Sequence, residues 1–550
     1  MSSSAAPARA SAAPIVRRVV VYTILFVLVV LVANGLSDLL TRLFTLATGS
    51  TIVSSGTGAL AVSLTFTLIG GPLAGLLGWF AWRRLADPPE RASVAWALYL
   101  VAVVTVSLIA FSTALLAAAA DAVAGDEFVG AAATGLVWAA VWAAHRFVLR
   151  RSGRRPTRLR GSAAVLGGTF GLVLGAGGAI RALAILFDNA LAGASDAVAG
   201  DPWWVGAAQA LIWAVGGALV WWWHWQRDGG RSTTTPLAGV AVVGVGILGG
   251  CLLALAGTGT VLFVLLRLGV DRSDPIGDVV DPLGLALAAA LVGGLVWVYH
   301  RGVVREGGTA VRDASSLATA GIALIAAATG IGVIVNALLA ALTSPLAGAD
   351  PRTLLLGGIS SVLVGGPLWW VTWRPLTALE PERRRSTGRS VYLVVVFGIS
   401  AVVALITLLV IGYRLFDSVL GGDAGLLESI RAPLGLLVAT GLVAGYHFNV
   451  WRGDRALVAA EPASPPASTP AITPAITELI LIMGPGGNPL AAHLRTHTGA
   501  RVEYWQRTGP TTAPPAPERV VDALAGVAGE RVVLLVGTDG TVTVMPVLPG

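Results

Sequence analysis

Histidine, tryptophan and arginine recur together where the chain leaves an apolar stretch. Two such ends share the pattern Trp-x-x-His-Arg: Trp142, His145 and Arg146, and Trp297, His300 and Arg301. Two further histidines, His224 and His447, lie at other ends of this kind. Neutral imidazole binds metals and takes up protons near neutral pH. A ring of these side chains at one level could therefore bind protons, a metal ion or haem.

The alternative interpretation is structural. Tryptophan and histidine are amphipathic, and arginine extends its charged group toward lipid phosphates, so all three collect where a membrane helix meets water. A metal site would also want carboxylates or thiolates, and none accompany these histidines in the sequence. We therefore expect an interfacial belt, with no catalytic residue, no metal and no cofactor.

Four arginines lie within apolar stretches, in their outer thirds: Arg42, Arg181, Arg267 and Arg414. An arginine at the centre of a bilayer costs about 2.5–3.5 kcal/mol on insertion scales, so these residues suggest a function such as lining an outward-facing vestibule. However, Asp38 precedes Arg42 by four residues, and Asp417 follows Arg414 by three. Each pair would share one helix face, so we expect mutual neutralisation instead.

Composition indicates a chain whose main solvent is lipid. Of 550 residues, 55% are hydrophobic and 12% are charged, and the mean hydropathy is +0.78. A soluble domain carries about 25% charged residues. The net charge of +7 and the pI near 10.2 come from arginines concentrated in short loops. That pattern sets orientation in a membrane, so we expect the lipid bilayer, and no nucleic acid, as a partner.

Twelve runs are long enough to cross a bilayer, which needs about 20 mostly apolar residues. The runs cover residues 19–46, 58–82, 94–120, 128–145, 162–190, 204–225, 237–268, 282–300, 315–342, 353–373, 391–419 and 432–450. We predict an all-α polytopic membrane protein with twelve transmembrane helices.

Arginine is distributed unevenly between the two sets of connections. The N-terminal segment 1–18, the connections after even-numbered runs and the segment after the last run hold 25 arginines, and the connections after odd-numbered runs hold three. By the positive-inside rule both termini are cytoplasmic. All basic residues are arginine, a bias typical of GC-rich bacterial genomes. We thus expect the bacterial cytoplasmic membrane.

Spacing indicates an internal repeat. Trp82, Trp225 and Trp373 are 143 and 148 residues apart. The histidines at 145, 300 and 447 are separated by 155 and 147 residues. This predicts three parallel four-helix units, related by an axis along the membrane normal. The predicted units cover residues 19–150, 161–303 and 315–451.

Three motifs carry a family resemblance. They are the Arg-x-x-Tyr-Leu helix start at 389–393, the Gly-Gly-Pro-Leu-Trp-Trp segment at 365–370, and the Trp-x-x-His/Trp-Arg helix ends. The chain resembles a bacterial membrane family known as domain of unknown function 5671, as three tandem copies over residues 17–455. The resemblance implies a multi-helix membrane fold and brings no activity or catalytic residue.

Beyond residue 455 the composition changes. A Pro-rich linker is expected over residues 456–475, followed by a small cytosolic α/β domain over 476–550. Its expected strands cover 479–483, 501–507, 531–536 and 541–547, and its helices 489–496 and 518–524. The Gly-rich turn at 484–488 could hold an anion, and His493 and His497 could share a metal. A tight turn and a solvated helix face are the simpler interpretations.

Function follows from what these parts could do. We predict a non-catalytic integral membrane protein whose tail module recruits or senses a cytosolic protein. The alternative is a pore or carrier for an apolar or weakly polar solute. The middle of the predicted spans lacks ionisable residues, which disfavours ion-coupled transport. No nucleophile–base pair or carboxylate pair is recognisable at one depth, so we do not expect an enzyme.

Overall fold

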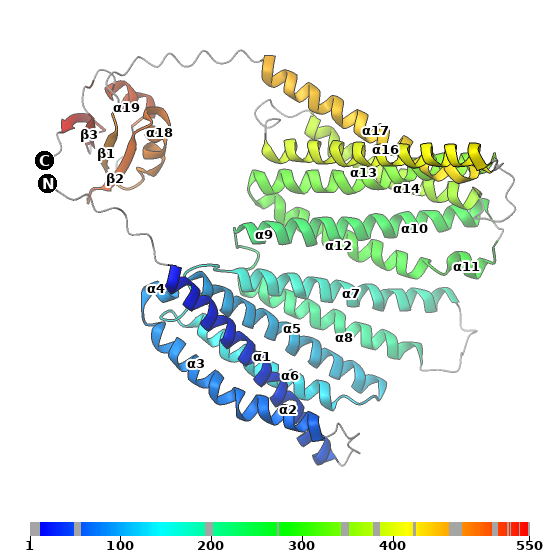
Figure 1. Cartoon of the computed structure of the whole chain (residues 1–550), viewed down its shortest axis with the longest axis horizontal. Coiled ribbons are helices and arrows are strands. Elements are labelled where there is room, and N and C mark those ends of the chain that lie inside the picture. The colour runs from blue at the N-terminus through cyan, green and yellow to red at the C-terminus, as the bar shows by residue number, and fades with distance from the viewer. Residues whose placement is uncertain are drawn as a thin grey trace. The chain divides into compact units, whose positions relative to one another are not determined.

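The computed structural model is mostly helical and divides into two compact units, Met1–Asp454 and Arg455–Gly550 (Figure 1). It describes residues 12–48, 57–192, 202–271, 274–342, 351–377, 386–421, 425–460, 476–508, 515–524, 527, 530–537 and 540–547. Residues 1–11 of the predicted N-terminal segment and residues 461–475 of the predicted linker lie outside these ranges.

Within these ranges, twelve helical spans in the first unit are long and apolar enough to cross a membrane, which confirms the predicted multi-pass architecture. Its helices are α1 (Ala12–Thr48), α2 (Thr57–Leu68), α3 (Gly70–Arg84), α4 (Pro88–Arg91), α5 (Val94–Ala124), α6 (Val129–Arg150), α7 (Ser162–Ala192), α8 (Trp203–Trp222), α9 (Pro236–Ala241), α10 (Gly250–Val270), α11 (Ile276–Val280), α12 (Leu283–Glu306), α13 (Thr309–Ala340), α14 (Pro351–Thr377), α16 (Thr387–Gly421) and α17 (Leu426–Ala460).

Two further elements are π-helical: η1 (Trp223–Arg227), which continues α8, and η2 (Val242–Gly249), which joins α9 to α10. A π-helical turn inserts an extra residue into the hydrogen-bond ladder, and such turns are frequent at functional sites. Both elements fall within the second predicted unit, and His224 lies inside η1.

Small residues let neighbouring helices approach closely. A Cβ added to Gly171 in α7 would lie 2.3 Å from the backbone nitrogen of Trp221 in α8. Gly175 and Gly217 continue this contact, and Gly330 in α13 meets Gly358 in α14 in the same way. Lipid tails supply no hydrophobic force between helices, so close backbone packing is what holds such pairs together.

The spans pack as hairpins that are joined side to side. The hairpins α5–α6, α7–α8, α10–α12 and α13–α14 each pack along their length. Helix α7 also contacts α12, and α10 contacts α14, so neighbouring hairpins form one body (Figure 1). Helix α16 is attached loosely by comparison, with Arg389, Leu393 and Thr407 as its buried residues.

The second unit is a small α/β domain, as predicted. Four strands form one sheet in the order β2-β1-β3-β4, in which β1 pairs parallel with β2 and β3, and β3 pairs antiparallel with β4. The elements are β1 (Glu478–Met483), α18 (Asn488–Thr498), β2 (Arg501–Gln506), α19 (Pro517–Leu524), β3 (Arg531–Val536) and β4 (Val542–Val547).

One face of this sheet forms the core. Leu479, Leu481, Val532 and Leu534 are fully buried there, against Leu494 and the other buried residues of α18 and α19. Alternate strand residues point to opposite faces, so the strict alternation in β1 and β3 assigns the remaining residues to the other face.

Candidate functional site

His145 is held between two hydrogen bonds at the end of α6. Its Nδ1 lies 2.8 Å from the Val141 carbonyl oxygen, and its Nε2 lies 3.1 Å from the Tyr99 hydroxyl. A carbonyl oxygen only accepts, so we assign the ring proton to Nδ1, which leaves Nε2 to accept from Tyr99. The ring is therefore fixed in a neutral tautomer at the α5–α6 contact.

His300 repeats the carbonyl contact of His145 near the end of α12. Its Nδ1 lies 2.7 Å from the Val296 carbonyl oxygen, and its ring packs on Trp225 and Tyr299. The Trp225 indole donates to the Tyr299 hydroxyl at 2.8 Å. A Cβ on Gly246 of η2 would lie 2.4 Å from the imidazole, so this glycine makes room for the ring.

His447 occupies the matching position in α17. Its Nδ1 lies 2.9 Å from the Val443 carbonyl oxygen, and Trp373 and Tyr392 pack against the ring. The Trp373 indole donates to the Tyr446 hydroxyl at 2.8 Å, as Trp225 does to Tyr299. In contrast to Tyr99 and His145, the Tyr392 hydroxyl and the His447 Nε2 are buried without a hydrogen-bond partner among the described residues.

His224 has a different environment, made of charged groups. It is buried within η1, and its Nδ1 lies 2.9 Å from the Asp228 carboxylate at an angle that is poor for a hydrogen bond. Arg146 of α6 forms an ion pair with the same carboxylate, and Trp142 packs edge-on against the imidazole. This buried cluster joins the first predicted unit to the second.

Electrostatics at Asp228 favour the charged carboxylate. Burial alone raises the pKa of this carboxyl, but the contact with His224 and the charge of Arg146 together outweigh burial, so its pKa lies below the usual range. The ion pair is therefore intact at neutral pH.

Three of the four histidines of the predicted belt are buried, whereas the tryptophans and arginines beside them are partly exposed. His224, His300 and His447 are almost fully buried, and each has its own aromatic neighbours. Arg301 and Arg146 lie over the rings of Trp297 and Trp142, at 5.0 and 5.6 Å from the ring centroids. These three imidazoles therefore lie inside the protein and do not face lipid. Their carbon edges pack against aromatic rings of neighbouring helices, which holds the helix ends together. Among the described residues, no group of three or more metal-ligating side chains forms.

The arginines inside spans also differ from one another. Asp38 pairs with Arg42 at 3.1 Å, as its spacing predicts. Arg267 pairs with Asp274 and lies 3.7 Å from Asp271.

Arg414 departs from the predicted pairing. It donates to the Ser429 carbonyl of α17, and no ion pair joins it to Asp417 in the described chain. Arg181 is exposed on α7 and has no ion pair within the described residues.

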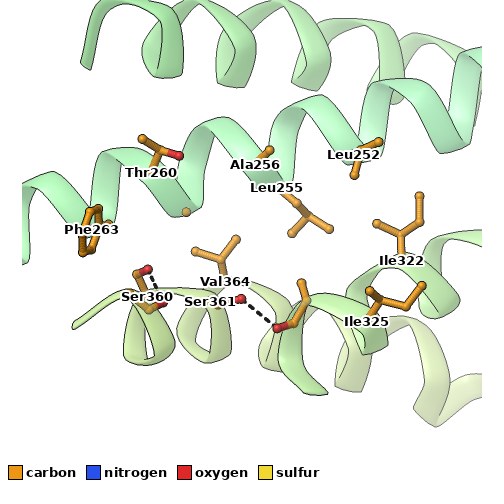
Figure 2. A pocket seen from close by; sticks show the side chains of 13 residues that line it. Leu252, Leu255, Ala256, Thr260, Phe263, Ile322, Ile325, Ser360, Ser361 and Val364 are labelled. Atoms are coloured by element: carbon orange, nitrogen blue, oxygen red, sulfur yellow. Dashed lines mark hydrogen bonds between the residues drawn. The ribbon is translucent and has the colours of Figure 1, made fainter. Parts of the chain in front are cut away.

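An apolar groove of about 430 Å³ lies between α10, α13 and α14 (Figure 2). Leu255 and Phe263 of α10 face Ile322 of α13 and the hydroxyl residues of α14 across it. Those hydroxyls are already committed: Ser360 donates to the Gly357 carbonyl and Ser361 to the Ala326 carbonyl. The groove therefore offers apolar surface and no charged group to a ligand.

In the tail domain, the turn at 484–488 is tied down by Tyr504. The Tyr504 hydroxyl donates to the Gly484 carbonyl at 2.5 Å and accepts from the Gly487 amide at 3.4 Å. His493 and His497 stack on the exposed side of α18, with ring centroids 6.0 Å apart. Both features match the simpler interpretations, a tight turn and a solvated face.

The outer face of the tail sheet carries exposed apolar side chains. Helices α18 and α19 cover the core face, and no other described element of this domain covers the outer face. Trp505 and Met545 are 55% and 41% exposed there. Around them lie Ile480, Ile482, Val533, Leu535 and Val547, with the Glu478–Arg531 ion pair at one edge.

A comparison with known families matches two segments of the membrane unit. The family model described as Domain of unknown function (DUF5671) matches residues 18–144 and 310–442. The match consists of two copies of this domain. They coincide with the first and third predicted units, and the match does not extend over the middle unit. Neither curated proteins nor solved structures gave a match.

Two charged residues of low exposure are not among the sequence-predicted site residues. Asp228 is one of them, although its spacing of four from His224 is a usable signal. Arg389 is the other: the sequence predicts it in a connection between spans, but it is 3% exposed and donates to Asp454 at 2.8 Å and to the Leu376 carbonyl at 2.7 Å. It thereby fastens the start of α16 to α14 and α17.

Proposed function

We propose that this chain is a non-catalytic protein of the bacterial cytoplasmic membrane that presents its tail domain to a protein partner in the cytosol. The open face of the tail sheet carries this proposal. A sheet with one apolar face left uncovered is unusual for a free domain, and exposed Trp and Met are typical of protein interfaces. The family lends no activity that competes with this function.

Orientation supports the location of the partner. The even number of spans returns the chain to the side where it began, and 25 loop arginines against three favour the cytosol for that side. We also propose that the middle segment is a diverged third copy of the DUF5671 domain. Its His300 repeats the carbonyl and aromatic contacts of His447, which supports common descent of the three segments.

The test is capture from membranes with matched variants of the full chain. Ile482→Glu places a charge on the open face, and Ala492→Glu places one on the exposed side of α18. We expect one protein to be crosslinked to the wild type and to the α18 variant, and lost from the open-face variant. The proposal fails if capture is equal in all three. It also fails if the face joins two copies of this chain, which sedimentation of the tail would reveal.

A carrier for an apolar or weakly polar solute is the second candidate. The groove between α10, α13 and α14 favours it, because its walls are apolar with a few hydroxyls. Solute flux into liposomes would be slowed by Ala256→Phe, which fills this groove, and left unchanged by the tail variants. If Ala256→Phe leaves the solute flux unchanged, transport through the groove between α10, α13 and α14 is excluded.

A further inference from the structure

A second, larger cavity lies within the third predicted unit, between α13, α16 and α17. Its volume is about 520 Å³, within the usual range of small-molecule sites. The walls are mainly valine, leucine, isoleucine and alanine side chains, with Thr329, Thr440 and Ser400 among them. The Thr440 hydroxyl is already bonded to the Leu436 carbonyl at 2.7 Å. The interior therefore suits an apolar occupant.

The cavity is elongated along the helices. On α13 its lining runs from Gly321 to Asn336, a separation of about 22 Å at ~1.5 Å per residue. On α17 it runs from Ala432 to Val443. The hydrocarbon core of a bilayer is about 30 Å thick, so this length exceeds half of the core. An occupant would lie parallel to the spans, as an acyl chain does.

Polar groups gather at one end of the cavity. The Asn336 amide oxygen accepts from Arg431 at 2.8 Å, and Glu428 neutralises Arg431. Arg414 of α16 reaches the same end, where it donates to the Ser429 carbonyl. Ser429 lies about one helical turn before Ala432, which lines the cavity.

Arg414 keeps free donors at this end. A guanidinium has five N–H groups, and the bond to Ser429 uses one of them. Its side chain is exposed, and no carboxylate pairs with it among the described residues. Arg414 lies seven residues before Gly421, the last residue of α16, which is about 10 Å along the helix axis. Its long side chain can therefore reach the lipid headgroups.

We propose that this cavity binds one acyl chain of a bilayer phospholipid whose phosphate is held by Arg414. A charged guanidinium in an apolar span is stabilised by a phosphate, and the bond is charge-assisted. At the groove between α10, α13 and α14, Arg267 lies over the ring of the lining residue Phe263, but Asp274 already neutralises it, so the same inference does not extend to that groove. This site is independent of the tail domain.

Photolabelling tests the site in the full chain. The protein is reconstituted in phosphatidylglycerol vesicles that contain a phospholipid with a photoactivatable group in its acyl chain, and labelled peptides are mapped. Ala328→Phe fills the cavity, and Ala256→Phe fills the other groove as its control. Arg414→Gln removes the charge, and Arg181→Gln removes a second exposed span arginine as its control.

We expect label on residues 321–336 and 432–443 of the wild type and both controls. Label there should fall about tenfold in Ala328→Phe and Arg414→Gln, equivalent to ~1.4 kcal/mol of binding. Arg414→Gln changes an exposed side chain, so it tests the site even if Ala328→Phe fails to fold. Equal labelling of wild type and Arg414→Gln would overturn the phosphate contact. Label absent from these peptides, or displaced by a second copy of the chain, would overturn the site.

Discussion

At the scale of single residues, three histidines share one bonding scheme and differ in how it is completed. Each donates through Nδ1 to the carbonyl four residues earlier, which places the imidazole beside its own helix. The Tyr99 hydroxyl forms a second hydrogen bond with Nε2 of His145. The Tyr392 hydroxyl forms no such bond with Nε2 of His447. These equivalent positions permit matched tests.

Tyr99→Phe should cost about 1 kcal/mol of stability, because it removes one buried hydrogen bond and leaves Nε2 of His145 unsatisfied. Tyr392→Phe should be neutral or stabilising, because that hydroxyl has no described partner to lose. Thermal unfolding of the purified protein in detergent would measure both. Equal losses in the two variants would contradict the assigned bonding.

Asp228→Asn should cost about 2 kcal/mol, since it leaves Arg146 charged and without its carboxylate in a largely buried position. Glu306→Gln is the control: its pair with Arg231 spans 2.6 Å but is largely exposed, so its loss should cost under about 1 kcal/mol. Thermal unfolding in detergent would compare the stability losses of these two variants. A cost no larger than that of the control would show that the Arg146 pair is not a structural joint.

The contribution of Asp228 should also depend on pH in one direction. Its pKa is lower in the folded protein than in the unfolded chain, so its stabilisation is complete above the unfolded pKa of about 3.9. It disappears as pH falls through the folded pKa. The stability difference between wild type and Asp228→Asn should therefore be large at pH 7 and shrink below about pH 4. A difference that grows on acidification would reverse the assigned shift.

At the scale of elements, glycine contacts decide how helices meet. Gly171→Ala should destabilise the α7–α8 hairpin by about 2 kcal/mol, because its Cβ would overlap the backbone of Trp221. Gly177 lies on the same helix with open space around its Cα, so Gly177→Ala should be neutral or stabilise through helix propensity. Unfolding in detergent and hairpin crosslinking would compare the two variants.

Much of this scale was predictable from sequence. Apolar run length located all twelve spans, because a bilayer accepts little else than a helix. Short, continuous apolar runs located β1 and β3 within a residue. The π-helical turns and the burial of His300 were not predictable, since both depend on which neighbouring helix brings Gly246 or Trp225 to the ring. The Arg414–Asp417 pairing failed for a similar reason: Ser429 of another helix competes for the guanidinium.

At the scale of the whole molecule, the proposed orientation of the chain in the membrane can be measured by labelling single engineered cysteines. The chain has one cysteine, Cys251, which is fully buried. Single cysteines at Ser152 and at Thr496 should therefore react with a membrane-impermeant reagent from the same side of the membrane. A cysteine at Asp126 should react from the opposite side. Reaction of Ser152→Cys and Asp126→Cys from one side would contradict the proposed topology.

The hairpin construction of the membrane unit has an evolutionary consequence. Every pair of spans brings the chain back to the surface it departed from, so adding or removing a pair leaves all later segments facing as before. Duplication and loss of whole pairs are thus tolerated changes, whereas gain of a single span would invert everything downstream, including the tail. Relatives of different lengths are accordingly expected to differ by even numbers of crossings.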